Sequence, residues 1–238
     1  MNDQKSEPRA PVLNRLLHAL PIIEYDRIFP DLEEVDLKLG TNIYGVSGKI
    51  PHVYFPNSGI ISLLASVEES ATLEVGIVGR EGMAGLPLFL GVKRSRITAI
   101  IQGNGTAMRM KAAAFEKETQ NGGALPRALL RFAHSMIVQI SQSAVCFRFH
   151  VIEMRLARWL LMTSDRMEQN EFRMTQEFLS SMLGVRREAV NRAAMSLQRR
   201  ELISYGRSNI LVIDRLGLEA AACKCYSILL NEEAELFA

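Results

Sequence analysis

The sequence lacks long apolar runs and has almost no net charge. No stretch reaches about 18 uninterrupted apolar residues, so no segment is expected to span a membrane. The first residues, MNDQKSEPRAP, are polar and contain no apolar core of a signal peptide. The formal charge is only +2 over 238 residues, so overall charge does not indicate a nucleic-acid partner. These absences predict a globular protein of the cytoplasm with no membrane partner.

Cysteine is also scarce. The chain contains only Cys146, Cys223 and Cys225, and no two of them have the CxxC spacing. An odd number of thiols without that spacing argues against a disulfide framework and against a zinc site. We therefore expect plain buried thiols, with no metal and no cofactor.

No catalytic machinery is recognisable. The sequence shows no nucleophile–base pair, no cluster of metal ligands and no glycine-rich phosphate loop between a strand and a helix. The histidines share no spacing that would indicate a haem site: His18, His52, His134 and His150. The sequence therefore predicts that the protein is not an enzyme.

Short alternating segments fill the region from Val35 to Met110. Apolar and polar residues alternate over residues 72–77, 97–101 and 106–110, with Gly, Pro and Asn between segments. Period two predicts strands that bury one face. Many short strands with frequent turn signals predict an antiparallel sandwich or barrel. A short helix over residues 12–19 is expected to precede it.

From residue 125 the apolar period lengthens to that of a helix. Spacings of three and four residues alternate over three heptads in one apolar stripe: Leu130, Ala133, Ile137, Ile140, Ala144, Phe147 and Val151. A second stripe beside it contains Leu129, Phe132 and Met136. We expect the second stripe to pack on the β-domain and the first on the same helix of another copy. The alternative is a helix buried within its own monomer. A further helix is expected over residues 151–167.

Residues 172–215 carry the positive charge that the chain as a whole hides. Eight arginines, four acidic residues and no lysine give a balance of 8 − 4 = +4. Thr175 is a good N-cap for a helix with an apolar face over residues 178–183, and Gly184 permits a sharp turn after it. A second helix is expected from Arg186 or Arg187. Its predicted outward residues are Arg187, Glu188, Asn191, Arg192 and Met195.

Two short helices joined by a glycine turn are typical of a helix-turn-helix, whose second helix enters the major groove. Arginine can bind guanine O6 and N7, glutamate can accept from cytosine N4, and asparagine can bridge adenine N6 and N7. The alternative is that Glu188 and Arg192 form only a surface ion pair worth about 0.2–0.5 kcal/mol. Residues 202–205 and 210–213 predict a hairpin that follows as a wing, with Arg207 at its tip near a phosphate. A final helix is expected over residues 218–230.

At this point the sequence resembles the Crp/Fnr superfamily of bacterial transcription regulators. The segment TQEFLSSMLGVRREAVNR, residues 175–192, is similar to the family's helix-turn-helix motif. The resemblance implies that Arg187, Glu188 and Arg192 read bases, with guanine and cytosine partners in a TGA-like half-site. One departure is Arg186, which stands where the family has a Ser or Thr N-cap. The cap bond is lost, and a phosphate contact is the expected gain.

The sensor half departs further from the family. Cyclic-nucleotide members carry a glutamate for the ribose hydroxyl and a later Arg-[ST]-Ala for the phosphate. Gly85 stands where the glutamate is expected, and Arg96 stands where the alanine is expected. Only Arg94 and Ser95 survive as half of this cassette, so Gly85, Arg94 and Ser95 mark the expected effector pocket. No cysteine cluster precedes Cys146, which argues against the iron–sulfur centre of oxygen-sensing members.

The sequence therefore predicts an α+β chain with three parts. These are a jelly-roll-like β-domain (residues 12–124), a dimerisation helix (125–150) and a winged helix-turn-helix domain (151–238). The expected partners are palindromic double-stranded DNA, a second copy of the chain and RNA polymerase, with an effector that the sequence does not identify. The expected DNA-binding residues are Thr175, Arg186, Arg187, Glu188, Asn191, Arg192 and Arg207. The alternatives are a cyclic-nucleotide-responsive regulator with a non-standard site and a ligand-binding module for protein partners.

Overall fold

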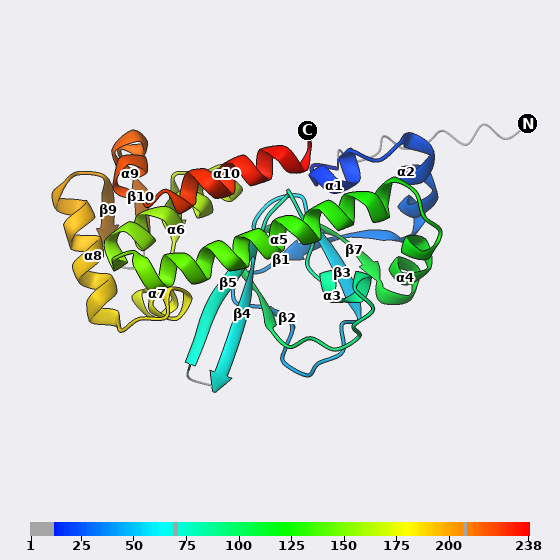
Figure 1. Cartoon of the computed structure of the whole chain (residues 1–238), viewed down its shortest axis with the longest axis horizontal. Coiled ribbons are helices and arrows are strands. Elements are labelled where there is room, and N and C mark those ends of the chain that lie inside the picture. The colour runs from blue at the N-terminus through cyan, green and yellow to red at the C-terminus, as the bar shows by residue number, and fades with distance from the viewer. Residues whose placement is uncertain (1–11, 69–70, 207–208) are drawn as a thin grey trace, which may run out of the picture.

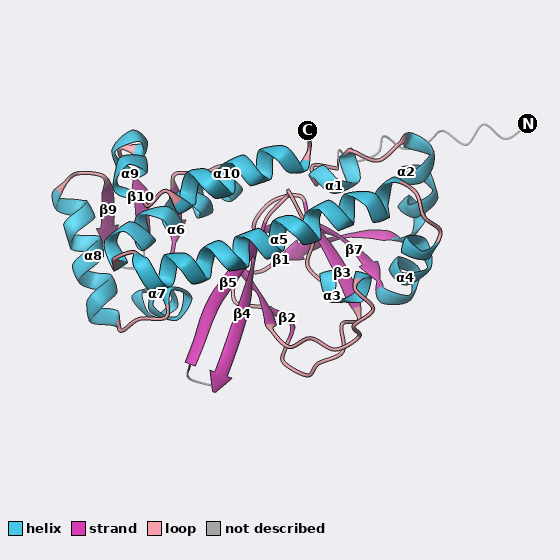
Figure 2. Ribbon diagram, viewed as in Figure 1, coloured by secondary structure: helices cyan, strands magenta, loops and turns pink. Residues whose placement is uncertain are grey.

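A computed structural model describes residues 12–68, 71–206 and 209–238 of the chain. An N-terminal β-domain and a C-terminal domain lie at opposite ends, and the long helix α5 runs between them (Figure 1). Within the described ranges, no helix combines the length and the apolarity needed to cross a bilayer. Helices and strands are both abundant (Figure 2), as expected for the predicted α+β class.

The β-domain consists of two antiparallel sheets. One has the strand order β1-β7-β3 and the other β2-β6-β4-β5. Their bounds are β1 (Leu32–Leu37), β2 (Asn42–Tyr44), β3 (His52–Pro56), β4 (Ile60–Glu68), β5 (Ala71–Val78), β6 (Thr98–Gly103) and β7 (Gly105–Lys111). Short helical segments flank the sheets: α1 (Arg15–His18), α2 (Ile22–Ile28), the 3₁₀ turn η1 (Phe29–Asp31), α3 (Leu86–Phe89) and α4 (Ala112–Gln120). This arrangement confirms the predicted two-sheet architecture.

Strand β5 differs from its prediction because helices cover the face that we expected to be polar and exposed. Glu74 and Gly76 are buried. A Cβ at Gly76 would lie 2.9 Å from Met136 Cε and 3.0 Å from Gln139 Oε1 of α5, so the glycine lets α5 pack closely on this strand. β5 is an edge strand, so its outer backbone groups have no partner strand. Gln139 of α5 supplies a hydrogen-bond partner there, because Ile77 N donates to Gln139 Oε1 at 2.6 Å. The helix therefore completes the sheet where another strand would otherwise pair.

Helix α5 (Ala124–Phe149) presents its two stripes as the spacing predicts. Leu129, Phe132 and Met136 are buried in the core of the β-domain. The other stripe faces outward: Leu130 is 61% exposed and Ile137 is 64% exposed. The alternative of a helix buried within its own monomer is therefore wrong for this face.

The C-terminal domain contains a three-stranded sheet of order β8-β10-β9 and the remaining helices. Its elements are α6 (Ile152–Met167), β8 (Glu171–Arg173), α7 (Gln176–Leu183), α8 (Arg187–Arg199), β9 (Ile203–Gly206), β10 (Asn209–Val212), α9 (Arg215–Ala221) and α10 (Cys225–Leu236). The wing hairpin was predicted, but its third strand, β8, was not. The single closing helix predicted over residues 218–230 is wrong, because the extended backbone of Ala222 (ψ 160°) ends α9 before α10 begins.

The two domains share one apolar core. Ile60, Leu64 and Ile77 of the β-domain pack in the same cluster as Trp159 and Leu160 of α6. A buried ion pair also joins the domains, since Arg166 Nε of α6 donates to Glu81 Oε1 at 2.8 Å. α6 is therefore packed firmly against the β-domain.

Glu74 lies at the centre of this contact between domains. Its carboxyl accepts from Trp159 Nε1 at 2.7 Å and lies 2.7 Å from Ser62 Oγ. The Ser62 oxygen also lies 2.5 Å from Gln102 Oε1, and a hydroxyl has one proton to donate. A protonated Glu74 that donates to Ser62 satisfies all three groups. Consistent with this, burial raises the pKa of Glu74 to about 7, although the Trp159 hydrogen bond and the charges of Arg158 and Arg166 lower it.

We expect Glu74 to make stability depend on pH. Its pKa of about 7 in the folded protein exceeds the ordinary 4.5, so the folded state holds the proton more tightly than the unfolded chain. The resulting stabilisation is full below pH 4.5 and is lost as the pH rises to about 7. The loss is roughly 3 kcal/mol at about 1.36 kcal/mol per pKa unit.

Urea unfolding between these pH values checks the effect with Glu74→Gln, whose amide mimics the protonated carboxyl. In Glu74→Gln, the free energy of unfolding should fall much less with rising pH than in the wild type. In Glu34→Gln, at an exposed position on β1, it should fall as much as in the wild type. Equal pH dependence in the wild type and Glu74→Gln would show that Glu74 is not the titrating group.

Candidate nucleic-acid interface

Helix α7 begins and ends at the predicted residues. The Thr175 hydroxyl oxygen accepts from Phe178 N at 3.1 Å, which caps the first turn. Leu179, Met182 and Leu183 bury the inner face. Gly184 ends the helix in the left-handed region at φ 61°, a conformation that favours glycine.

Helix α8 starts at Arg187 and presents the predicted outer face. Val190, Ala194 and Leu197 are fully buried, which fixes the rotation of the helix about its axis. The opposite face is exposed and consists of Arg187, Glu188, Asn191, Arg192 and Met195. Arg186 is the N-cap and makes no side-chain cap bond, as its departure from the family motif predicts.

The ion pairs on this surface are not the Glu188–Arg192 pair that the sequence left open as an alternative. Arg187 Nη2 pairs with Glu177 Oε2 at 2.7 Å, and both side chains are largely exposed. Among the described residues no salt bridge joins Glu188 to Arg192, so that surface pair is absent. An exposed pair such as Arg187–Glu177 contributes about 0–1 kcal/mol, so separating it to reach a ligand costs little.

A groove of about 550 Å³ lies between the start of α7, the outer face of α8 and the wing. Besides residues already predicted, it is lined by three polar residues that the sequence did not single out: Gln176, Gln198 and Tyr205. Gln198 Oε1 accepts from Tyr205 N at 3.2 Å, which ties α8 to β9. Gln176 directly follows the N-cap Thr175. That position was the one feature of the sequence that could have indicated that Gln176 lines the groove.

Several arginines on this side are free to bind an external anion. Arg200 pairs with Glu153 at 2.9 Å and Arg215 pairs with Asp165 at 2.7 Å, so their charges are balanced internally. Within the described ranges, no ion pair engages the exposed Arg173, Arg186, Arg192 and Arg199. Arg207, predicted at the wing tip, lies outside the described residues.

The residues expected to form an effector pocket are only partly brought together. Arg94 and Ser95 line an open groove of about 480 Å³ with Lys93 and Arg96, and no carboxylate lines it. Ser95 is buried, and its hydroxyl donates to Ile97 O at 2.6 Å. Gly85 does not line this groove. It precedes α3 at φ 103°, where a Cβ would lie 2.8 Å from Val53 Cγ1.

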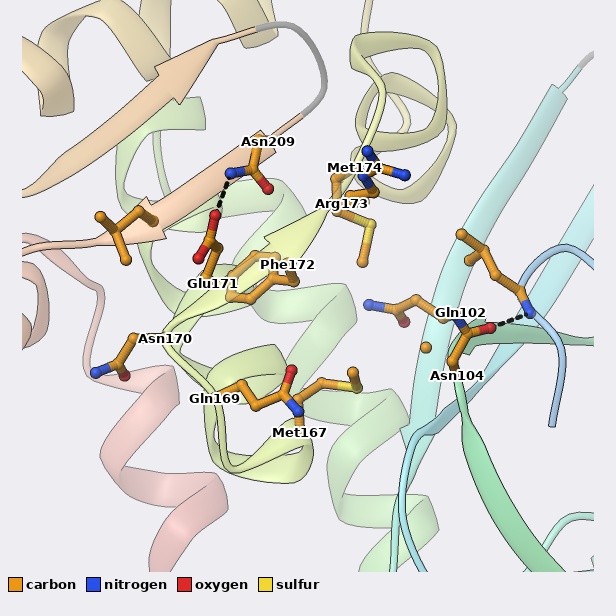
Figure 3. A pocket seen from close by; sticks show the side chains of 13 residues that line it. Gln102, Asn104, Met167, Gln169, Asn170, Glu171, Phe172, Arg173, Met174 and Asn209 are labelled. Carbon is orange, nitrogen blue, oxygen red and sulfur yellow. Dashed lines mark hydrogen bonds between the residues drawn. The ribbon is translucent and has the colours of Figure 1, made fainter. Parts of the chain in front are cut away.

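A larger groove of about 670 Å³ opens between the β-domain and the winged domain. Figure 3 shows Gln102 and Asn104 of the β-domain on one side and Glu171, Phe172 and Asn209 on the other. Its lining consists mostly of amides and thioethers, and Asn209 donates to Glu171 Oε1 at 2.5 Å. This groove could not be predicted from the sequence, because its walls come from segments about 70 to 170 residues apart that only the packed domains bring together.

All three cysteines are buried free thiols, as expected, but the fold also brings them together. Cys146, Cys223 and Cys225 lie together with His150, and one ligand atom of each falls within 4.8 Å of the others. The spacing along the chain concealed this cluster, because α10 returns to pack beside α5.

The chain thus joins an N-terminal β-domain through a long helix to a winged helix-turn-helix domain. Residues 154–221 match the family model of the Crp-like helix-turn-helix domain. The C-terminal part of the chain is thus a Crp-like helix-turn-helix domain, and the whole chain has the fold of Crp/Fnr transcriptional regulators. No curated protein matches the sequence.

Solved structures of Crp/Fnr regulators align with most of the chain. A transcriptional regulator of the family from Eubacterium rectale is 17% identical, with a TM-score of 0.69 over 87% of this chain and 97% of that chain. FixK2 from Bradyrhizobium japonicum is 16% identical, with a TM-score of 0.67 over 81% and 98%. The c-di-GMP responsive regulator CLP from Xanthomonas campestris is 16% identical, with a TM-score of 0.62 over 81% and 99%. At such low identity these similarities establish the fold.

The turn between α7 and α8 provides a test of the local structure. In Gly184→Ala, the left-handed backbone should cost about 1–2 kcal/mol of unfolding free energy. The new methyl would also lie 2.6 Å from Leu73 Cδ1 of β5. The substitution should therefore cost more in the wild type than in a Leu73→Ala background, where only the backbone strain remains.

Urea unfolding of the four proteins in this cycle measures both contributions. Gly45→Ala is the matched control, because a Cβ there meets nothing within 4 Å. A Gly184→Ala protein as stable as Gly45→Ala would contradict the assigned turn.

Proposed function

We propose that the protein is a sequence-specific DNA-binding transcription regulator that acts as a homodimer on a two-fold symmetric operator. The observation that carries this proposal is the outer face of α8. Its buried face fixes the helix, while Glu188 and Arg192 are exposed and unpaired with each other. These side chains lie one helical turn apart and can address neighbouring base pairs in a major groove.

Positive charge and a hydroxyl donor near α8 favour binding of DNA phosphates. The unpaired Arg186 and Arg199 add positive charge at the first and last turns of α8. The Thr175 hydroxyl accepts a cap bond but keeps its own proton to donate to a phosphate oxygen. The net charge of +2 is therefore a poor guide to the electrostatic potential around α8, which is more positive than that value suggests.

The free stripe of α5 favours a second copy of the chain as the other partner. Leu130, Ile137 and Ile140 are exposed along one side of a 26-residue helix. Three- and four-residue spacing is the pattern of a two-stranded coiled coil. A parallel pair of α5 helices would place two recognition helices about a two-fold axis, with half-sites about one turn, roughly 10–10.5 bp, apart.

Selection from a random DNA pool tests whether α8 recognises the base sequence. Arg192→Ala should weaken binding by about 1–3 kcal/mol per half-site and flatten the base preference at one position of each half-site. Loss of one arginine elsewhere should not alter the motif. Arg96→Ala is the charge-matched control, because Arg96 is exposed on the β-domain.

An Arg192→Ala protein that selects the unaltered wild-type motif would contradict the placement of α8. A wild type that selects no motif at all, with binding that depends only on salt, would contradict sequence-specific recognition itself.

Sedimentation tests the dimer independently of DNA. Ile137→Glu should place like charges opposite each other across the axis and separate the copies into monomers. Ile23→Glu is the matched control, since Ile23 is 79% exposed on α2 and far along the chain from the stripe. Dimers that persist in Ile137→Glu would show that another surface holds the copies together.

A further inference from the structure

The cluster near the end of α5 has the composition of a metal site. Cys146 and His150 come from the last turn of α5, whereas Cys223 and Cys225 come from the junction of α9 and α10. Their ligand atoms all lie within 4.8 Å of one another. Cys146 Sγ and Cys223 Sγ are 3.5 Å apart, and Cys225 Sγ and His150 Nδ1 are 3.4 Å apart.

These separations suit one tetrahedral ion. Zn–S bonds of about 2.3 Å at tetrahedral angles place two sulfurs about 3.8 Å apart. A four-iron cluster binds each thiolate on a different iron, and the resulting spread exceeds what atoms within 4.8 Å enclose. Thiolate and imidazole ligands select zinc and similar borderline or soft ions over magnesium or calcium.

The chain spacing is also suited to chelation. Cys146 and His150 are four residues apart, the i,i+4 relation by which two ligands on one helix face hold zinc. All three cysteines are buried, so water does not compete freely for an ion held there. Gln142, one turn before Cys146, donates through Nε2 to Cys225 Sγ at 3.0 Å and orients that sulfur.

A buried cation beside the cluster points to a negative charge there. Arg158 is only 5% exposed, and its Nε and Nη1 have no hydrogen-bond partner among the described residues. Its charge acts on Cys146, Cys223 and Glu74. A buried guanidinium without a counterion is costly. Three thiolates, a neutral histidine and one divalent ion carry 2 − 3 = −1, which offsets part of the positive charge of Arg158 and of its buried neighbour Arg155.

We propose that Cys146, His150, Cys223 and Cys225 bind one divalent zinc-type ion in a tetrahedral three-sulfur, one-nitrogen site. His150 is the C-cap of α5, and Val151 is the N-cap of α6. An ion bound here fastens the α5–α6 junction to the start of α10. The site thus ties the helix that carries the free apolar stripe to the winged domain.

Cobalt and zinc titrations of the untagged, reduced, chelator-stripped full chain test this proposal. Co²⁺ should give thiolate-to-cobalt charge-transfer absorption that saturates at one ion per chain and is displaced by Zn²⁺. X-ray absorption of the zinc-loaded wild type should show three sulfurs at about 2.3 Å and one nitrogen at about 2.0–2.1 Å. A first shell of only oxygen and nitrogen, an iron–sulfide cluster, or no stoichiometric binding would overturn it.

Variants assign the ligands. Cys146→Ser, Cys225→Ser and His150→Ala should each weaken zinc binding by more than the roughly 10–100-fold typical of losing a supporting contact. His134→Ala is the matched control, because His134 is exposed on the same helix and outside the cluster. Unchanged affinity in a folded Cys225→Ser protein would overturn the assignment. Should a variant not fold, the absorption spectrum of the wild type still decides.

Discussion

The hydrogen bond between Trp159 and Glu74 fixes how the two ends of the molecule are joined. It buries an indole N–H and a carboxyl between β5 and α6, in a core to which both domains contribute. An unsatisfied polar group in such a place costs about 1–3 kcal/mol, so α6 cannot slide along β5 without losing stability. Since α8 packs directly on α6, the orientation of the recognition face follows from this contact.

The same contact connects the sites described above. Arg158 lies next to Trp159 in the chain, and its charge acts on Glu74 and on the buried thiols. On the outer side, Leu73 of β5 lies against Gly184, in the turn that leads into α8. One strand of the β-domain therefore contacts both α6, through Glu74, and the turn between α7 and α8, through Leu73. A displacement of β5 would therefore act directly on α7 and on the turn that precedes α8.

Local patterns in the sequence predicted the parts of the fold that depend on neighbouring residues. Thr175, Gly184 and the period of Val190, Ala194 and Leu197 were enough to place α7 and α8, because caps, turns and amphipathic faces are encoded within a few residues. The two stripes of α5 were predicted for the same reason. Strand period also located β5, β6 and β7, whereas β1 to β4 were not placed individually.

Features created by distant segments were not predictable in this way. Glu74 has the spacing of an exposed residue on β5, yet α6, from about 80 residues later, covers it. The thiols seemed isolated because Cys146 and Cys223 are 77 residues apart, and only the return of α10 beside α5 joins them. The Arg187–Glu177 pair likewise depends on how α7 crosses α8. Tertiary packing, not local pattern, decides these positions.

The proposed function requires that the outer face of α8 contacts base edges in the major groove. Methylation interference tests it most directly, because methylating guanine at N7 blocks an acceptor that faces the major groove, whereas methylating adenine at N3 blocks one that faces the minor groove. Bound DNA should be depleted of N7-methylated guanines in two clusters about one helical turn, roughly 10–10.5 bp, apart. Binding that is insensitive to guanine N7 methylation, or that is blocked only by adenine N3 methylation, would contradict it.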